Sequence, residues 1–462
     1  MRRVGSPAET GGTVSRIRLV AVVATVALSL GTLGAFSTTA GAQRAKAPLT
    51  STEIGVTPTT ITVTVVAAID VPGFPGLFQG SHNGVDGWAK YINNSCKPKN
   101  TCVAGRKIIV KHVDSKLSGD AARAAFKNAC QDSFALIGTG VLLLTNFDDI
   151  TTCADKAGAI SGMPDFGVTI TEVAEQCSAS SFGVNPATLR CATKDQHPQT
   201  YIGNTGATQY FVKKFGKLKG AFLYPSDSAS AKNSQVPNFT SQGKRGISMV
   251  YSHDLSALDA LPAYTSVAGG IRDSGANYAR SGLAFNSTVN LRTEAQTQGL
   301  TGIKVWDCSL QCYDKKLVAP ENKAVVEGQY VYTPFLPFLG KTSEASVNKT
   351  LQAFVKNTKD PDGFAIQAFA AGLFFDDAVK AATGGDNNKL TRKGLIAAAD
   401  NIHSFNAGGM IGTVDVGGRV PGPCFVLMQV KNGQFVRVFP KKKGTFDCSK
   451  SNEVTLKLDL IK

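Results

Sequence analysis

Segments typical of buried strands alternate with segments of helical periodicity, in two separate runs. The first run contains four predicted strands and three predicted helices: Thr60–Asp70, Ser81–Asn93, Lys107–Val113, Asp120–Cys130, Ser133–Thr139, Phe147–Ala157 and Gly158–Met163. The second run begins with a helix: Thr200–Phe215, Gly220–Tyr224, Lys232–Gly243, Ile247–Tyr251, Leu258–Ser274, Tyr278–Phe285, Val289–Gln298 and Ile303–Cys308. Such alternation predicts parallel sheets covered by helices on both faces. The fold class is therefore predicted to be α/β, with two doubly wound parallel-sheet lobes.

The last third of the chain does not start a third run. Glu327–Phe335 has the composition of a strand that crosses back from the second lobe. Asn432-Gly433 is a strong hairpin turn signal between two apolar segments. The other predicted elements are the helices Val347–Lys356, Phe364–Ala382 and Leu390–Ile402 and the hairpin strands Cys424–Val430 and Gln434–Phe439. We expect residues 43–195 to form the first lobe, 196–330 the second, and 331–462 a return that completes both through a multi-crossover hinge.

The N-terminus has the three parts of a secretory signal peptide. Four arginines, at positions 2, 3, 16 and 18, precede the apolar segment Leu19–Leu30. Ala40-Gly41-Ala42 then supplies the small residues that a signal peptidase recognises. This predicts a signal peptide over residues 1–42, cleavage after Ala42 and an exported, extracytoplasmic protein. An uncleaved membrane anchor is the alternative, although the apolar core is shorter than the ~20 residues that a span requires.

Ten cysteines favour the same oxidising compartment. An even number of cysteines in an exported chain predicts disulfides, whose connectivity the sequence leaves open. Taken in order, they form neighbouring pairs that each close a short loop: Cys96–Cys102, Cys130–Cys153, Cys177–Cys191, Cys308–Cys312 and Cys424–Cys448. The spacing does not suggest a metal site, because Cys308-x-x-x-Cys312 is isolated and has no histidine near it. We expect no metal and no cofactor.

Charge and motif content argue against two functional classes. The formal net charge is +15, but Lys and Arg are spread along the chain, and the densest run is Lys441-Lys442-Lys443. Nucleic-acid-binding proteins concentrate such charge, so we expect no nucleic-acid partner. The sequence lacks G-x-S-x-G, H-E-x-x-H and P-loop motifs, and its five histidines are scattered. We therefore expect no enzymatic activity, and a secreted hydrolase is the weakest alternative.

Seven short motifs occur in an order that is similar to one known family. They are Ile54–Thr57, Gly105–Val110, Asp120–Cys130, Phe134–Gly138, Val326–Gly328 with Thr333–Phe335, Gly363–Ala382 and Phe405–Val416. The chain thereby resembles the type 1 periplasmic binding proteins of ABC importers, in particular the leucine/isoleucine/valine-binding group. The resemblance implies capture of a small solute outside the membrane, an ABC permease as partner, and a monomer. A secreted sensor of the same fold is the alternative. The loop after the first strand departs from the family, with Pro72-Gly73-Phe74-Pro75-Gly76 in place of small, Ser-containing sequence.

Loops that follow parallel strands are the candidate ligand-binding segments, because ligands bind beyond the carboxyl ends of such strands. In the first lobe the candidates are Phe74, Phe78, Gln79, Gly138, Thr139, Gly140 and Asp165. In the second lobe they are Tyr224, Ser226, Asp227, Phe285, Asn286 and Asp307. Gly138-Thr139-Gly140 either cradles a carboxylate with backbone N–H groups or only makes a tight turn. An amino-acid-like solute of the branched-chain type fits these residues, and aromatic amino acids, organic acids and amides remain open.

Overall fold

Four parallel strands from the first run form one sheet, in the order β2-β1-β3-β4. The computed structural model describes residues 47–71, 76–144, 146–168, 172–191, 197–256 and 258–460; the predicted signal peptide lies outside them. The strands are β1 (Thr60–Ala67), β2 (Lys107–Asp114), β3 (Ala135–Ile137) and β4 (Asp165–Phe166). The helices beside them are α1 (Gln79–Ser95), α2 (Gly119–Asp132), α3 (Asp148–Thr151) and α4 (Val173–Cys177). Most of β1 is buried, as expected of a central strand covered on both faces.

The strand predicted over Gly158–Met163 is wrong. Within this segment Ile160 forms only an isolated bridge, and its side chain is 74% exposed. Gly158 and Gly162 have φ values of 84° and 74°, a left-handed conformation that interrupts an extended strand. The short strand β4 begins only after this segment, at Asp165.

Seven strands form the second sheet, in the order β13-β12-β11-β10-β9-β7-β8. Its first five strands in the sequence are parallel, and the C-terminal hairpin adds two antiparallel strands. The strands are β7 (Leu218–Pro225), β8 (Ile247–Leu255), β9 (Tyr278–Ser281), β10 (Val305–Cys308), β11 (Tyr330–Thr333), β12 (Val426–Lys431) and β13 (Gln434–Phe439). The helices are α5 (Gly206–Phe215), α6 (Ala229–Asn233), α7 (Gln235–Gly243), α8 (Leu261–Asp273), α9 (Phe285–Thr297) and α10 (Lys323–Val326). The predicted α/β class with parallel sheets is confirmed.

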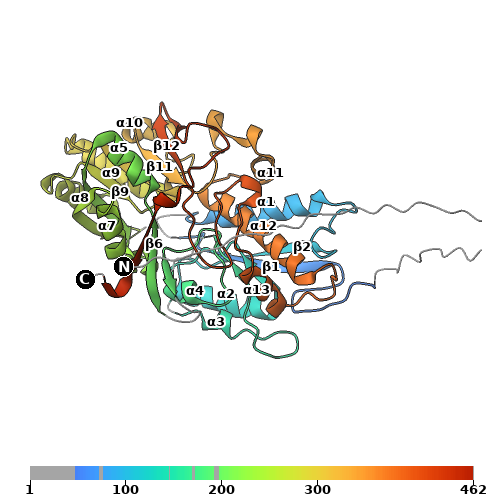
Figure 1. The fold of residues 1–462 in the computed structure, drawn as a ribbon. Helices are drawn as coiled ribbons and strands as arrows, with labels where there is room; N and C mark the ends of the chain where they lie inside the picture. The colour runs from blue at the N-terminus through green and yellow to red at the C-terminus, as the bar shows by residue number, and fades with distance from the viewer. Residues whose placement is uncertain are drawn as a thin grey trace, which may run out of the picture. The chain divides into compact units, whose positions relative to one another are not determined.

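A third, small sheet joins segments that are far apart in the sequence. Its strands are β5 (Leu189–Cys191), β6 (Pro198–Asn204) and β14 (Glu453–Lys457), in the order β14-β6-β5. Figure 1 shows β6 (green) next to the C-terminal end of the chain (red). The helix predicted over Thr200–Phe215 is therefore wrong in its first third, which forms part of β6. Helix α5 begins only at Gly206.

Helix α12 (Gly363–Thr383) brings the C-terminal third of the chain back onto the first sheet. Its apolar residues are buried around most of its circumference, which is typical of a helix inside a core. It packs so closely on α1 that glycine is required at two contact positions. A Cβ atom at Gly372 would lie 2.2 Å from the Trp88 ring, and one at Gly84 would lie 2.2 Å from the Ala365 carbonyl oxygen. The Trp88 indole also donates to Asp376 at 2.9 Å. In the described part of the chain, no helix combines the length and apolar character needed to span a membrane.

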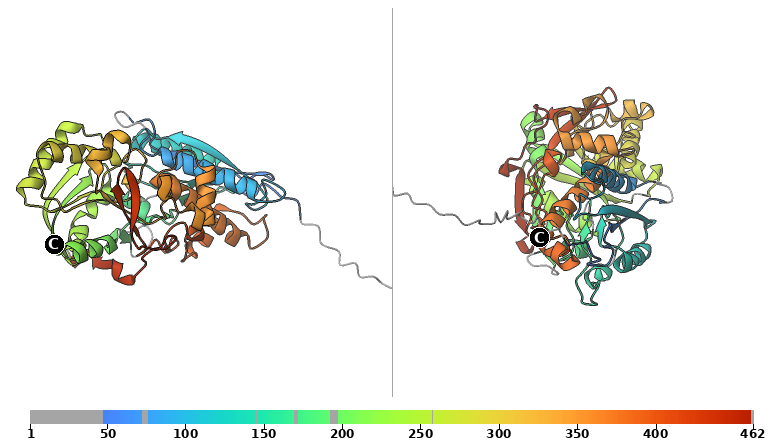
Figure 2. Two further views of the ribbon diagram at one scale, coloured as in Figure 1. Left: turned by 90° about the horizontal axis from the view of Figure 1, so that it is seen from above. Right: turned by 90° about the vertical axis from the view of Figure 1, so that its right-hand side faces the viewer.

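The two helices on either side of α12 complete this region. They are α11 (Lys349–Asn357) and α13 (Arg392–Asp400). Helix α11 contacts α1, and α13 contacts α12; Figure 2 shows orange helices of this region beside the blue α1, although more than two hundred and fifty residues separate them in the sequence. The return of the chain thus supplies part of the core that surrounds the first sheet.

All ten cysteines form the disulfides expected from pairing neighbours in the sequence. The bonds are Cys96–Cys102, Cys130–Cys153, Cys177–Cys191, Cys308–Cys312 and Cys424–Cys448. The loops that they close span 4 to 24 residues of sequence separation. This connectivity, which the sequence left open, is confirmed.

A half-buried histidine in α1, beside a second histidine in β2, makes stability depend on pH. The rings of His82 and His112 lie 4.9 Å apart, and burial, followed by the charge of His112, lowers the pKa of His82 to about 4. An unfolded histidine titrates near pH 6.5, so between pH 6.5 and 4 the unfolded state binds a proton that the folded state excludes. As the pH falls from 6.5 to 4, the free energy of unfolding of the wild type should therefore decrease. We expect this decrease to be about 2 kcal/mol smaller in His82→Gln.

Chemical denaturation at several pH values between 7 and 4 measures this difference. His253→Gln, the same substitution at an exposed position, provides the control for the loss of a histidine. Parallel stability curves for the wild type and His82→Gln would contradict the prediction.

Candidate ligand-binding cavity

A cavity of about 370 Å³ lies between side chains contributed by both larger sheets and their connections. This volume lies within the range of small-molecule sites. On the side of the first sheet the lining includes Leu77, Phe78, Leu142, Val184, Phe364 and Gln367. On the side of the second sheet it includes Phe222, Tyr224, Asp227, Arg280, Leu283 and Tyr332. A molecule in this cavity would therefore contact both halves of the protein.

The second half of the lining comes from the carboxyl ends of neighbouring parallel strands. Pro225 ends β7, Gly282–Ala284 follow β9, Ser309–Gln311 follow β10 and Pro334 follows β11. Because these strands are parallel, their carboxyl ends meet at one edge of the sheet, which is where α/β proteins bind ligands. The cavity lies where the strand order of the chain predicts a binding site.

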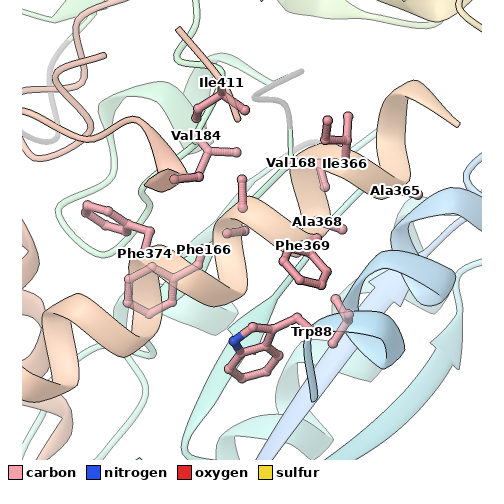
Figure 3. Close-up of a cluster of buried hydrophobic side chains, with 14 of the residues drawn as sticks. Trp88, Phe166, Val168, Val184, Ala365, Ile366, Ala368, Phe369, Phe374 and Ile411 are labelled. Carbon is pink, nitrogen blue, oxygen red and sulfur yellow. The ribbon is translucent and has the colours of Figure 1, made fainter. Parts of the chain in front are cut away.

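The first half of the lining is mostly apolar. The rings of Phe78 and Phe364 meet edge to face, with their centroids 4.8 Å apart. These residues lie at the starts of α1 and α12, so the close packing of the two helices positions both rings. Figure 3 shows two further lining residues, Val184 and Ile411, beside α12, with Trp88 on the side of α12 that faces α1. The cavity thus has an apolar wall backed by a rigid core.

A positive charge lies on the opposite wall. Arg280 in β9 is half-buried, and its Nη2 donates to the Tyr332 hydroxyl of β11. Below it on the same face of the sheet, the Tyr278 hydroxyl donates to Asp307 at 2.7 Å. Burial lowers the pKa of Arg280, but the surrounding Tyr332, Tyr278 and Asp307 raise it by more, so its guanidinium stays charged. Burial raises the pKa of Asp307 to about 6, and Arg280 opposes this shift.

Two buried polar atoms in the lining have no hydrogen-bond partner among the described residues. One is the hydroxyl of Tyr224, whose residue is only 6% exposed. The other is Oε1 of Gln367, whose amide nitrogen donates to the Gly363 carbonyl at 2.7 Å. Buried polar groups in proteins are nearly always hydrogen-bonded. These two atoms are therefore available to a ligand in the cavity.

The structure distributes the residues predicted from strand ends among three environments. Phe78, Tyr224 and Asp227 line the cavity. Asp227 also accepts a hydrogen bond from the Ser256 hydroxyl at 3.1 Å. Phe74 lies outside the described residues. The other predicted residues lie beside or beneath the cavity and are not part of its lining.

The loop after β3 forms a closed polar cluster. The Thr139 hydroxyl donates to Asp165 at 2.6 Å, and the Ser181 hydroxyl donates to the other oxygen of the same carboxylate at 2.7 Å. Burial raises the pKa of Asp165 to about 6, although the two hydroxyl donors oppose the shift. The N–H groups of Gly138 and Gly140 donate to backbone carbonyls of β4 and β1. This cluster holds the strands of the first sheet together next to the cavity.

The remaining predicted residues belong to neighbouring elements. Gln79 is the first residue of α1, and Ser226 follows β7 with its N–H bound to a carbonyl of β8. Phe285 and Asn286 begin α9, because β9 ends at residue 281, earlier than predicted. Asp307 is buried beneath Arg280 in β10.

Sequence reasoning missed Arg280, Tyr332 and Gln367. Gln367 lies inside α12, whose sequence is almost entirely apolar and predicts a buried core helix. Nothing in the surrounding sequence indicates that its amide reaches a binding site. Arg280 did give a local signal, because an arginine within a short, largely buried strand is unusual. The surroundings of Arg280 come from the neighbouring strands, and the order of these strands in the sheet could not be predicted from the sequence.

Comparison with known families covers most of the chain. A model of the periplasmic binding protein family matches residues 60–434. The chain belongs to the periplasmic binding protein family. A search of curated proteins with this chain found no match.

Solved structures of periplasmic binding proteins have the same fold. The fatty acid ABC transporter substrate-binding protein from Thermomonospora curvata has a TM-score of 0.59 at 14% identity, over 86% of this chain and 95% of that one. A leucine-binding protein from Thermotoga maritima has a TM-score of 0.58 at 17% identity, over 82% and 97%. An ABC transporter solute-binding protein from R. palustris, in complex with 4-hydroxybenzoate, has a TM-score of 0.57 at 16% identity, over 82% and 95%. These similarities confirm the type 1 periplasmic binding protein fold.

Proposed function

We propose that this protein is the extracytoplasmic substrate-binding protein of an ABC transporter, and that it captures a small solute in the cavity for delivery to a membrane permease. The observation that carries the proposal is the composition of the cavity lining, which takes an apolar wall from one half of the molecule and strand ends from the other. A ligand that contacts both halves stabilises the closed arrangement over the open one, which is the basis of hinge closure. The family match supports the same function.

An amino-acid-like solute of the branched-chain type suits the lining. Phe78, Phe364 and Leu142 offer contacts for an aliphatic side chain. Arg280 and Asp227 carry the opposite charges that the two ends of an amino acid require. The similar leucine-binding protein supports this ligand class. The proposal includes export by a cleaved signal peptide over residues 1–42 and a monomeric mature chain, with lobes over 43–195 and 196–330 completed by 331–462.

A thermal-shift screen of the exported protein against amino acids, organic acids, amides and sugars tests the proposal. A solute at ~100 times its dissociation constant should add about 2.7 kcal/mol to the free energy of unfolding. Phe364→Ala should weaken binding of that solute about tenfold, because it removes an aromatic contact from the apolar wall. Val347→Ala is the control, since Val347 is 55% exposed and does not line the cavity. If no solute in the screen stabilises the protein, the proposed function is wrong.

A further inference from the structure

We propose that Arg280 and Tyr224 hold the carboxylate of the bound solute, so that the natural ligand is an organic acid with an apolar body; this rests on the function proposed above. The proposal places the anion site on the second sheet. The loop Gly138–Gly140, which the sequence suggested for this role, forms a closed cluster beside the cavity.

Arg280 has more donors than the protein uses. A guanidinium carries five N–H donors. Among the described residues, the contacts of Arg280 are the hydrogen bond to the Tyr332 hydroxyl and the stacking of the guanidinium carbon 4.8 Å from the centre of the same ring. A half-buried cation whose donors face a cavity is a site for a planar, bidentate anion such as a carboxylate.

The nearest acidic residue does not neutralise Arg280 through an ion pair. Asp307 lies directly opposite Arg280 on the neighbouring strand β10. One of its oxygens accepts the Tyr278 hydroxyl, and no ion pair links it to Arg280 in the described part of the chain. Removing a guanidinium from water is costly unless an anion compensates for the lost hydration. The charge of Asp307 stabilises the guanidinium without a direct contact, and a ligand carboxylate would add the direct hydrogen bonds to Arg280 that Asp307 does not accept.

Tyr224 supplies a second donor on the same face of the sheet. Phe222 of β7 is in register with Arg280 of β9, and Tyr224 is two residues further along β7, so all three side chains point to one face. Tyr224 lines the cavity and is 94% buried, and its hydroxyl has no hydrogen-bond partner among the described residues. A carboxylate bound to Arg280 would give this hydroxyl the acceptor that it lacks.

The rest of the cavity fits the apolar body of such an acid. The opposite wall presents Phe78, Phe364 and Leu142. Among the lining residues that the structure describes, Asp227 is the acidic residue and Arg280 is the basic residue. The site therefore accepts an apolar acid, with or without an amino group that contacts Asp227.

Calorimetric titration of the exported protein with matched pairs of solutes tests the inference. The pairs are leucine and leucinamide, octanoate and octanamide, and 4-hydroxybenzoate and 4-hydroxybenzamide. We expect at least one acid to bind about 100-fold more tightly than its amide, since hydrogen bonds to a charged group are the strong ones. An amide that binds as tightly as its acid would overturn the inference.

Two variants assign the effect to the named residues. Arg280→Gln should weaken binding of the acid about 100-fold and leave binding of the amide nearly unchanged. Tyr224→Phe should weaken binding of the acid about tenfold. It should do so without unfolding the protein, because the lost hydroxyl has no partner within the described chain. Tyr264→Phe is the matched control, since Tyr264 is fully buried in α8 and does not line the cavity.

The outcomes separate this inference from the proposed function. Full affinity for the acid in Tyr224→Phe, or in a folded Arg280→Gln, would overturn the carboxylate site. So would a protein that binds only solutes without a carboxylate, although the proposed transport function would then stand. A protein that binds none of the acids and nothing in the wider screen would overturn both.

Discussion

Replacing Glu344 with glutamine is expected to lower the free energy of unfolding by about 3–5 kcal/mol, because it leaves a buried arginine without its counter-ion. Glu344 is 1% exposed and forms a bidentate ion pair with Arg437 of β13, with N–O distances of 2.5 and 2.6 Å. The same carboxylate accepts the Gly444 N–H at 2.7 Å. The pair thereby joins the segment after β11 to the C-terminal hairpin and to the loop that follows it. Urea denaturation of Glu344→Gln measures the loss.

An exposed ion pair of the same length provides the control. Lys315 and Asp360 lie 2.6 Å apart, but their side chains are 59% and 54% exposed. Water already solvates both groups, so Asp360→Asn should cost under about 1 kcal/mol. Equal losses for Asp360→Asn and Glu344→Gln would show that burial does not set the strength of the Glu344–Arg437 pair.

Replacing Arg392 with methionine is expected to cost about 3–5 kcal/mol, because several buried acceptors lose their donor at once. Arg392 is fully buried at the start of α13. Its guanidinium donates to three carbonyl oxygens between the end of α2 and the start of β3, those of Cys130, Ser133 and Phe134, and to the carbonyl oxygen of Ala154, which follows α3. Methionine fills a similar space but donates no hydrogen bond.

The neighbouring residue supplies a matched control for Arg392. Lys393 is exposed in the same turn of α13, and Lys393→Met should change stability by less than about 0.5 kcal/mol. Thermal and urea denaturation of both variants measure the difference. If Arg392→Met is as stable as Lys393→Met, the guanidinium does not hold the C-terminal helices on the first sheet.

The alternation of strands and helices was predictable because each buried strand and each amphipathic helix carries its own local pattern. β1, β7 and α12 are apolar enough to be recognised without knowledge of their partners. β6 was not recognised, because it lies between β5 and β14 in its sheet, and β14 comes about 250 residues later in the sequence. Contacts over such a separation leave no local pattern in either segment.

Prediction of the candidate site was limited by element boundaries and by strand order. β9 ends at Ser281, so the residues reaching the cavity are Gly282–Ala284, while Phe285 and Asn286 already belong to α9. The pairing of Arg280 with Tyr332 depends on β9 and β11 flanking β10. Propensity and periodicity describe single elements, so they could not place these two side chains together.

The disulfides have a consequence for how the chain matures. Each cysteine bonds to the next cysteine in the sequence, so a chain that emerges N-terminus first always presents the correct partner before any competing thiol appears. Oxidation in the order of emergence gives the native connectivity, with no need for an isomerase to reshuffle bonds. No bond joins the residues up to Cys191 to those from Cys308 onward. The disulfides therefore restrain individual loops and do not restrain motion of the two larger sheets relative to each other.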